Sequence, residues 1–573
     1  MARFLLGVVT GIALVFLAVV LVLVAVVRMR NKPPSVADNA VLVLRLEGDI
    51  PEKPALEWPI LDNGRGAITV TGVWVALRQA AADGRIKAVV VEPGGLASGW
   101  GKLEEIRADL ATFRKSGKPV YAYLRSPGGR EYYTALAADR IYLGPEDPLM
   151  LKGMRAEILY FKKTLDKLGV TVYVEHAGKY KDFGDMFTRS DMSPETREVT
   201  SSIVDDLFGN LVNRIAEARH KTPGETRALI DTGPFTATQA RKAGLVDSLA
   251  FEDQMWGELK DKLHSGGLSK VPIEKYIKVP AEDAGLRAGS KIALVAGEGD
   301  IVRGDPDDAG EDGELGSYGF NKLLREVGAD SSIKGVIVRI NSPGGEVTAS
   351  DEIWREMKLL SQKKPLVISM SDVAASGGYY MALTGDPVVA YPGTETGSIG
   401  VVFGKPDLHG LYDKLGVSKD AVERGRNADI DSDYTELSPA ERDLLKAGID
   451  ESYRMFVEKV AEARHKPYDY IEPLAQGRVW LGSQAQPRGL VDALGGLDTA
   501  VSLLKQKAKI PDAETVSVVM YPARRNLLDL LFQRSAEQSV ARVELRRVFG
   551  RAPYHAWMRG GMLRLMPIWL EVR

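Results

Sequence analysis

Short runs of apolar residues alternate with longer charged segments along most of the chain. Residues 87–91 (Lys-Ala-Val-Val-Val) precede the charged segment 102–115, and the same alternation recurs in the second half. Short apolar runs are typical of buried strands, and strands that alternate with helical patterns are typical of α/β proteins. The sequence therefore predicts an α/β fold.

The longest apolar stretch lies at the amino terminus. Residues 4–27 carry no charge, and a helix of this length is about 36 Å long, enough to cross a hydrocarbon core of about 30 Å. No Ala-x-Ala-like cleavage site follows, so we expect an uncleaved transmembrane anchor with a tether at residues 28–40. More cations follow the anchor than precede it, and the positive-inside rule alone favours a body in the cytoplasm.

The rest of the chain contains two diverged copies of one unit. Ala-Glu-Ala-Arg-His-Lys at residues 216–221 recurs at 461–466, 245 positions later, and Gly-Leu-Val-Asp at 244–247 recurs at the same offset. This period is far longer than that of a solenoid and indicates a duplicated domain. We expect three regions after the tether: an N-terminal domain at 41–285, a C-terminal domain at 286–520 and an extension at 521–573.

The second copy contains a candidate nucleophile. Ser376 is flanked by small residues and follows a Pro-Gly-Gly turn at residues 343–345, which itself follows an apolar strand pattern. Glycines in such a turn leave backbone N–H groups free to point at a substrate oxygen. We expect an oxyanion hole made by Gly377 and by either Gly344 or Gly345, and the sequence leaves that choice open.

The two copies differ at this position and at one other. Aligning the Tyr-Tyr pair at 132–133 with the pair at 379–380 places Gly129 opposite Ser376, so the first copy lacks the serine. The first copy has the segment Gly-Lys-Tyr-Lys at 178–181, and the second copy has no lysine at the matching place.

Four motifs resemble those of one protein family. They are Gly-Lys-Tyr-Lys at 178–181, Asn-Ser-Pro-Gly-Gly at 341–345, Ala-Ser-Gly-Gly-Tyr at 375–379 and Thr-Gly-Ser-Ile-Gly at 396–400. From about residue 40 to about residue 510 the chain resembles the long form of signal peptide peptidase A, of the S49 serine peptidase family. That resemblance implies that Ser376 is the nucleophile, that Lys181 of the first half is the general base, and that Ser398 holds the lysine.

The resemblance also implies an architecture and a location. The implied fold is a tandem pair of β–α spiral domains of the ClpP and crotonase type, assembled as a homo-oligomer, by resemblance a homotetramer. The implied location is the bacterial inner membrane with a periplasmic or otherwise extracytoplasmic body, which opposes the orientation that the charges favour. The implied substrates are cleaved signal peptides and other extended hydrophobic peptides.

Elementary chemistry is consistent with a Ser/Lys dyad. A lysine acts as a base only if its pKa falls from about 10.4 toward 7–8, and burial between two domains lowers it. Lys179 is a rival for Lys181 because it lies in the same motif. A histidine base is a second alternative, but His220 and His465 occupy equivalent repeat positions, which indicates a structural role. The other four histidines lie in no recognisable motif.

Composition narrows the remaining choices. A net charge of −2 gives no reason to expect a nucleic-acid partner, and the absence of cysteine excludes disulfides and thiol catalysis. No metal-ligand spacing or phosphate-binding loop is present, so we expect neither a metal nor a cofactor. The extension at 521–573 contains many arginines, and we expect a helical hairpin or a basic amphipathic segment on anionic lipid.

Two functions of different class remain at this stage. The first is a membrane-anchored serine endopeptidase that acts through an acyl-enzyme. The second is a non-proteolytic member of the same fold, either a crotonase-like acyl-thioester enzyme or a membrane scaffold, which would need neither Ser376 nor Lys181.

Overall fold

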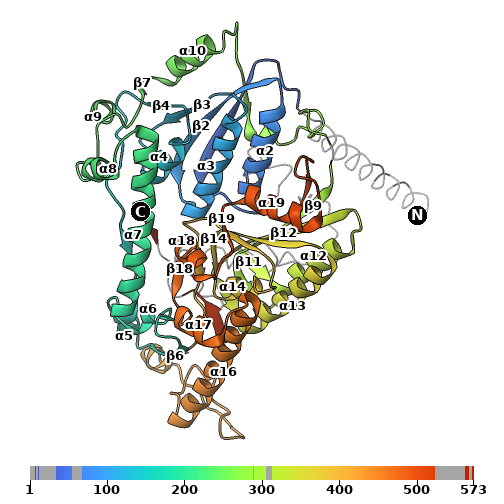
Figure 1. Cartoon of the computed structure of the whole chain (residues 1–573). Helices are drawn as coiled ribbons and strands as arrows, with labels where there is room; N and C mark the ends of the chain where they lie inside the picture. Colours follow the sequence, from blue (N-terminus) through green and yellow to red (C-terminus); the bar gives the residue numbers. More distant parts are fainter. Residues whose placement is uncertain are drawn as a thin grey trace.

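The structure is a computed structural model that describes residues 7, 11, 14, 34–53, 68–287, 289–304, 313–522, 562–566 and 571–572. The predicted membrane anchor, residues 4–27, lies outside these residues except for three isolated positions. Within the described ranges, no helix is both long enough and apolar enough to cross a membrane. Two α/β units lie one against the other in the body of the molecule (Figure 1).

The first half is built on a parallel sheet of six strands in the order β7-β4-β3-β2-β1-β8. Its strands are β1 (Ala40–Gly48), β2 (Ile86–Leu96), β3 (Val120–Leu124), β4 (Arg140–Leu143), β7 (Ser248–Leu249) and β8 (Ser269–Pro272). Strand β3 is buried along its whole length, as expected for a parallel strand covered on both faces.

The second half repeats this topology. Its eight-stranded sheet contains the path β19-β15-β14-β12-β9-β20, in which each strand occupies the place of its counterpart in the first sheet. Strands β16 and β18 extend the sheet beside β14. The bounds are β9 (Lys291–Glu298), β12 (Ile333–Ser342), β14 (Leu366–Ala375), β15 (Val388–Ala390), β16 (Glu395–Gly397), β18 (Val479–Leu481), β19 (Ala493–Leu494) and β20 (Ser517–Tyr521). The predicted α/β fold and duplication are confirmed.

The helices repeat as well. Those of the first half are α2 (Val70–Ala82), α3 (Trp100–Arg114), α4 (Gly129–Ala135), α5 (Lys162–Leu168), α6 (Asp185–Thr188), α7 (Pro194–Arg219), α8 (Pro223–Ile230), α9 (Ala237–Lys242), α10 (Glu252–Lys262) and α11 (Ile273–Tyr276). Those of the second are α12 (Ser317–Ala329), α13 (Val347–Lys363), α14 (Gly377–Met381), α15 (His409–Leu415), α16 (Pro439–Arg464), α17 (Tyr468–Ile471), η2 (Glu472–Leu474), α18 (Gly482–Ala485), η3 (Gln486–Arg488) and α19 (Leu497–Ala508).

The longest helices show how the repeated sequence sets repeated boundaries. Helices α7 and α16 each have 26 residues, and each begins with a serine cap followed by proline at the first helical position. Each ends at a histidine with a φ of 52°, His220 in one and His465 in the other. These two histidines are therefore helix C-caps, in agreement with the structural role predicted for them.

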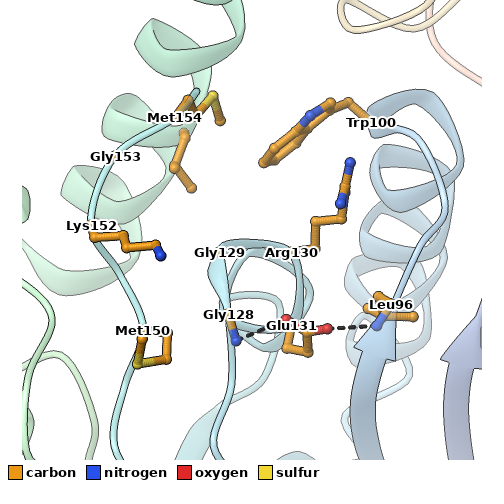
Figure 2. Close-up of a pocket in the computed structure, with 11 residues that line it drawn as sticks. Leu96, Trp100, Gly128, Gly129, Arg130, Glu131, Met150, Lys152, Gly153 and Met154 are labelled. Carbon is orange, nitrogen blue, oxygen red and sulfur yellow. Dashed lines mark hydrogen bonds between the residues drawn. The ribbon is translucent and has the colours of Figure 1, made fainter. Parts of the chain in front are cut away.

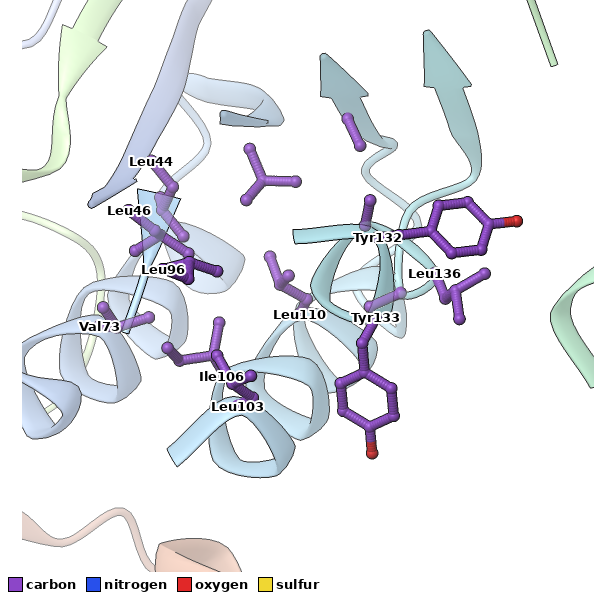
Figure 3. Packing of buried hydrophobic residues seen from close by; sticks show 14 of the residues in the cluster. Leu44, Leu46, Val73, Leu96, Leu103, Ile106, Leu110, Tyr132, Tyr133 and Leu136 are labelled. Carbon is purple, nitrogen blue, oxygen red and sulfur yellow. The ribbon is translucent and has the colours of Figure 1, made fainter. Parts of the chain in front are cut away.

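Each half has its own apolar core. In the first half, Leu103, Ile106 and Leu110 of α3 follow helical spacing and pack under the strands, together with Leu44 and Leu46 of β1 (Figure 3). Burying each such side chain stabilises the fold by about 1.5–3 kcal/mol. The second half has an equivalent core around β12, β14 and α16.

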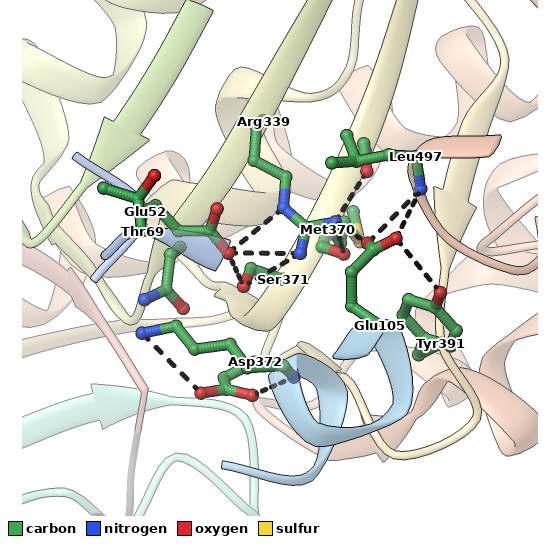
Figure 4. A network of polar contacts seen from close by, with 12 residues as sticks. Glu52, Thr69, Glu105, Arg339, Met370, Ser371, Asp372, Tyr391 and Leu497 are labelled. Carbon is green, nitrogen blue, oxygen red and sulfur yellow. Dashed lines mark hydrogen bonds and ion pairs between the residues drawn. The ribbon is translucent and has the colours of Figure 1, made fainter. Parts of the chain in front are cut away.

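A buried charge network joins the two halves (Figure 4). Arg339 on β12 pairs with Glu52 and Glu105 of the first half, in each case at 3.1 Å, and all three side chains are at most 1% exposed. Beside them, Asp372 on β14 accepts hydrogen bonds from the backbone N–H groups of Gly99 (2.8 Å) and Lys102 (2.7 Å) at the start of α3. The second half thus caps a helix of the first.

A third sheet combines strands from both halves and from the extension. Its order is β11-β10-β13-β21-β17-β6, with β6 (Thr171–Ala177), β10 (Asp300–Val302), β11 (Glu314–Gly316), β13 (Gly344–Glu346), β17 (Val401–Asp407) and β21 (Met562–Leu565). A two-stranded sheet pairs β5 (Ala156–Glu157) with β22 (Glu571–Val572). Residues 562–565 and 571–572 of the extension form strands, which differs from the helical hairpin or amphipathic segment expected there. Residues 523–561, 567–570 and 573 lie outside the described ranges.

Substitution of Arg339 tests the charge network. Arg339→Met leaves Glu52 and Glu105 buried without their counter-charge, so we expect a loss of about 3–5 kcal/mol in the free energy of unfolding. Lys162→Met is the matched control, since it breaks an exposed i,i+4 pair with Asp166 and costs about 0.3–0.5 kcal/mol. The measurement is denaturant-induced unfolding, and equal effects of the two variants would refute the role assigned to the network.

Candidate active site

Ser376 lies between the end of β14 and the start of α14, with its side chain fully buried. Its backbone has φ 54° and ψ −113°, a conformation that residues other than glycine rarely adopt. The Ser376 N–H donates to the Gly397 carbonyl at 2.8 Å, and its own carbonyl accepts from Tyr380 N–H at 2.8 Å. Backbone strain of this kind is held only where the surroundings fix it, and it concentrates at functional positions.

Lys181 reaches the same place from the first half. It follows β6 in a loop held against residues 476–478 of the second half, where Tyr180 N–H donates to the Gln476 carbonyl at 2.8 Å. The approach is so close that a Cβ on Gly477 would lie 2.6 Å from both the Cβ and the amide nitrogen of Lys181. Glycine at 477 is therefore required for the lysine to occupy its position.

The lysine amine contacts both serines named in the sequence analysis. Lys181 Nζ lies 2.8 Å from Ser376 Oγ, 2.9 Å from Ser398 Oγ and 2.9 Å from the Ser398 carbonyl oxygen. All three side chains are fully buried. Burial, reinforced by the positive charge of Arg564 and weakly opposed by Asp182, holds the pKa of Lys181 well below its usual 10.5.

The glycines predicted for the oxyanion hole lie beside Ser376. Gly344 N–H donates to Ser342 Oγ at 3.2 Å, so this donor is already used within its own loop. The amide nitrogen of Gly345 lies 3.1 Å from where a Cβ on Gly377 would be. Gly377 is the first residue of α14, and the first N–H groups of a helix have no intrahelical partner. Because Gly344 N–H is already used in its own loop, Gly345 is the better candidate for the second donor; its strand β13 is paired with β21 in this structure.

The rival bases lie elsewhere. Lys179 points to solvent, and its Nζ lies 4.6 Å from the centre of the Tyr180 ring. His176 Nδ1 lies 3.0 Å from the Gly178 carbonyl oxygen on the exposed side of β6. Lys405 of β17, a further lysine of the second half, donates from Nζ to the Thr435 carbonyl at 2.9 Å. No histidine in the part of the chain that the structure describes contacts Ser376, and His555 lies outside that part.

The first half has a matching but different site (Figure 2). Helix α4 takes the place of α14, and its Glu131 accepts hydrogen bonds from the N–H groups of Leu96 (2.6 Å) and Gly128 (2.9 Å). A cavity of about 260 Å³ adjoins it, lined by Leu96, Trp100, Gly128, Gly129, Arg130, Glu131, Met150, Lys152, Gly153, Met154 and Leu211. A carboxylate thus binds N–H groups next to the first half's counterpart of the glycine loop, since Leu96 follows the Pro-Gly-Gly turn at 93–95 and Gly128 precedes α4.

The repeat alignment shifts by one residue at this point. Tyr132 and Tyr379 make equivalent bonds, each donating its hydroxyl to a leucine carbonyl of the same repeat motif, which pairs Gly129 with Ser376. The helix caps instead pair Gly128 with Ser376. Neither glycine has a hydroxyl, so the first half lacks a nucleophile in either alignment.

Two residues beside Lys181 were not predicted from the sequence. Gly477 appears in no motif and is recognised only from its contact with Lys181. Arg564, in β21, is 1% exposed and lies beside the site. The alternation Met-Leu-Arg-Leu-Met at 562–566, bounded by glycines and by Pro567, was the available signal for a strand there.

Comparison with known proteins identifies the class. The model of peptidase family S49 matches residues 112–265 and 358–511, one stretch in each half. The chain therefore belongs to peptidase family S49, and it is an enzyme that acts on peptide bonds.

Two sequence relatives agree with this assignment. "Protease 4" of Haemophilus influenzae is 32% identical over 86% of this chain and 83% of that protein. "Serine protease SPPA, chloroplastic" of Arabidopsis thaliana is 36% identical over 77% of this chain, and the match spans 66% of that protein. Among solved structures, ClpP1 from Listeria monocytogenes matches with 14% identity and a TM-score of 0.21, over 36% of this chain and 91% of that one.

Gly477→Ala tests the positioning of Lys181. The added methyl group meets the lysine backbone at 2.6 Å, so Lys181 must move, and we expect peptide hydrolysis to fall about 100-fold. Gly416→Ala is the matched control, because Gly416 has a similar φ (70°, against 74° for Gly477) but nothing within 4 Å of an added Cβ. Initial rates on a fluorogenic peptide measure both variants, and unchanged activity of Gly477→Ala would contradict the prediction.

Proposed function

We propose that the protein is a serine endopeptidase in which Ser376 is the nucleophile and Lys181 the general base. The contact of 2.8 Å between Lys181 Nζ and Ser376 Oγ, inside a fully buried site, is the observation that carries the proposal. A serine hydroxyl is a weak nucleophile until a neighbouring base takes its proton, and the lowered pKa of Lys181 leaves more of its amine neutral and able to take that proton.

The reaction follows from this arrangement. The neutral amine of Lys181 accepts the Ser376 proton while Oγ attacks the carbonyl carbon of the peptide bond. The N–H groups of Gly345 and Gly377 stabilise the oxyanion, and the lysine ammonium then gives its proton to the departing amine. Water, activated by the same amine, hydrolyses the acyl-enzyme and restores Ser376. Ser398, through its hydroxyl and carbonyl, keeps the amine directed at Ser376.

The substrates and setting of the proposal come from the family resemblance. Cleaved signal peptides and other extended hydrophobic peptides are the proposed substrates. Residues 4–27 are proposed to anchor the protein in a bacterial inner membrane with its body outside the cytoplasm, and several copies are proposed to assemble. The non-proteolytic alternative has no use for a buried lysine in contact with a serine, which favours the peptidase.

Variants of the two residues test the dyad. Ser376→Ala and Lys181→Met should each reduce kcat by more than about 1,000-fold, and the double variant should be no worse, because members of one catalytic unit do not contribute additively. Lys179→Met is the matched control and should retain activity, since this lysine is exposed. An additive double variant, or an inactive Lys179→Met, would refute the assignment.

The pH dependence tests the base separately. Below the pKa of Lys181 the amine is protonated and cannot accept the serine proton, so kcat/KM should rise with pH, with a midpoint well below 10.5. Ser398 Oγ accepts a hydrogen bond from the ammonium and so stabilises the charged form. Ser398→Ala should therefore move the rising limb to lower pH while lowering its plateau. If the midpoint of the kcat/KM–pH profile is the same in Ser398→Ala, the hydrogen bond between Ser398 Oγ and the Lys181 ammonium does not have this role.

A further inference from the structure

Strand β21 fills a gap in the sheet next to Ser376. On one side it pairs antiparallel with β13, with Gly344 opposite Leu565 and Gly345 opposite Arg564. On the other side it pairs antiparallel with β17, with Val402 opposite Leu563. Without β21, the facing edges of β13 and β17 have no strand between them. The gap is one strand wide, and exposed strand edges of this kind bind extended peptides by adding them as a strand.

The register places one carbonyl of this strand at the glycines beside Ser376. A Cβ on Gly344 would lie 1.9 Å from the Arg564 carbonyl oxygen and 2.7 Å from the Gly377 amide nitrogen. The Arg564 carbonyl therefore borders the space that the proposed mechanism assigns to the oxyanion. Met566 N–H donates to the Pro343 carbonyl at 2.8 Å and extends the pairing past this point. A substrate carbonyl would have to reach the same place.

The side chains of β21 alternate between two environments. Leu563 and Leu565 join an apolar cluster with Phe183 and Val402. Arg564 points the other way, where its guanidinium carbon lies 3.7 Å from the centre of the Tyr380 ring and 5.0 Å from that of Phe456. This aromatic-walled space, bounded by Tyr380 and Phe456, is called the side-chain pocket below.

The pocket suits an apolar side chain better than the arginine it holds. Among the described residues, Nε and Nη1 of Arg564 are buried without a hydrogen-bond partner. Asp351, a carboxylate whose charge acts on Arg564, already accepts hydrogen bonds from Tyr380 Oη (2.6 Å) and Lys459 Nζ (2.9 Å). Lys459 Nζ also lies 5.0 Å from the Tyr380 ring centre, which adds a like charge. The ring faces of Tyr380 and Phe456 offset part of the cost of burying this cation, but no carboxylate among the described residues forms an ion pair with it. An apolar side chain in the same place avoids the remaining cost of desolvating a charge.

We propose that residues 562–566 occupy the peptide-binding groove in the register of a substrate, and that external peptides with an apolar residue at the place of Arg564 displace them. The inference rests on the proposed function, since the groove is identified by its position beside Ser376. The chain then carries its own weak competitor. Because residues 562–566 belong to the same chain as the groove, the strength of their competition with external peptide depends on their effective concentration at the groove.

Two changes in β21 should act in opposite directions. Leu563→Asp with Leu565→Asp places charges in the apolar cluster and releases the segment, so external peptide should bind about tenfold more tightly. Arg564→Leu removes the unpaired cation from the pocket and strengthens the segment, so external peptide should bind about tenfold more weakly. Adding the two aspartates to Arg564→Leu should restore tight binding, which a misfolded Arg564→Leu protein would not show.

The experiment uses the full chain in a Ser376→Ala background, where binding is measured without turnover. The probe is a fluorescent peptide Gly-Met-Leu-Leu-Leu-Met, compared with the same peptide carrying arginine at its fourth position, and anisotropy gives the Kd. Leu415→Asp, at a leucine that is 67% exposed, is the matched surface control and should change nothing. The leucine peptide should bind more tightly than the arginine peptide.

The outcomes separate this inference from the proposed function. Equal Kd values for all variants, tighter binding to Arg564→Leu, or a preference for the arginine peptide would each overturn the inference. If the expected binding pattern appears but the chain with Ser376 hydrolyses no peptide, the groove assignment stands and the catalytic proposal fails. Conversely, if the chain with Ser376 hydrolyses peptide but KM is the same in all β21 variants, the catalytic proposal stands and the groove assignment fails.

Discussion

The buried contact between Lys181 and Ser376 is the constraint on which the site depends. An amine so placed must be desolvated, and only an interface that closes on every side removes the water. Arg339 with Glu52 and Glu105, and Asp372 at the start of α3, hold that interface together through charges that are themselves buried. Neither half encloses the lysine alone, so the low pKa belongs to the pair of domains and not to the loop that carries Lys181.

Duplication followed by divergence explains why the two halves differ where they do. Both retain the same order of strands, and both long helices keep the same caps. At the site, the changes lie beside the strand ends: Glu131 in the first turn of α4 occupies backbone donors in the first half, and the second half has no lysine corresponding to Lys181. A frame fixed by core packing can accept such changes, because loop residues contribute little to the cores.

Much of this arrangement was predictable from sequence, for identifiable reasons. Apolar runs and the repeat offset predicted the α/β halves, and Ser376, Lys181 and Ser398 were named from motifs that resemble a known family; the structure brings these three side chains into contact. The choice between Gly344 and Gly345 needed the hydrogen bond to Ser342, and the pairing of β21 with β13 joins segments about 220 positions apart. Strand register over such separation depends on tertiary packing, which no local pattern encodes.

The one-strand gap between β13 and β17 has a consequence for what can be cut. A polypeptide that enters it must present both of its edges at once, so a strand already paired in a sheet or a helix bonded to itself cannot fit. Folded proteins contain few segments with both backbone edges unpaired, whereas a peptide released from its parent chain consists mostly of such backbone. In the proposed groove, this width excludes segments that are folded, whatever their sequence.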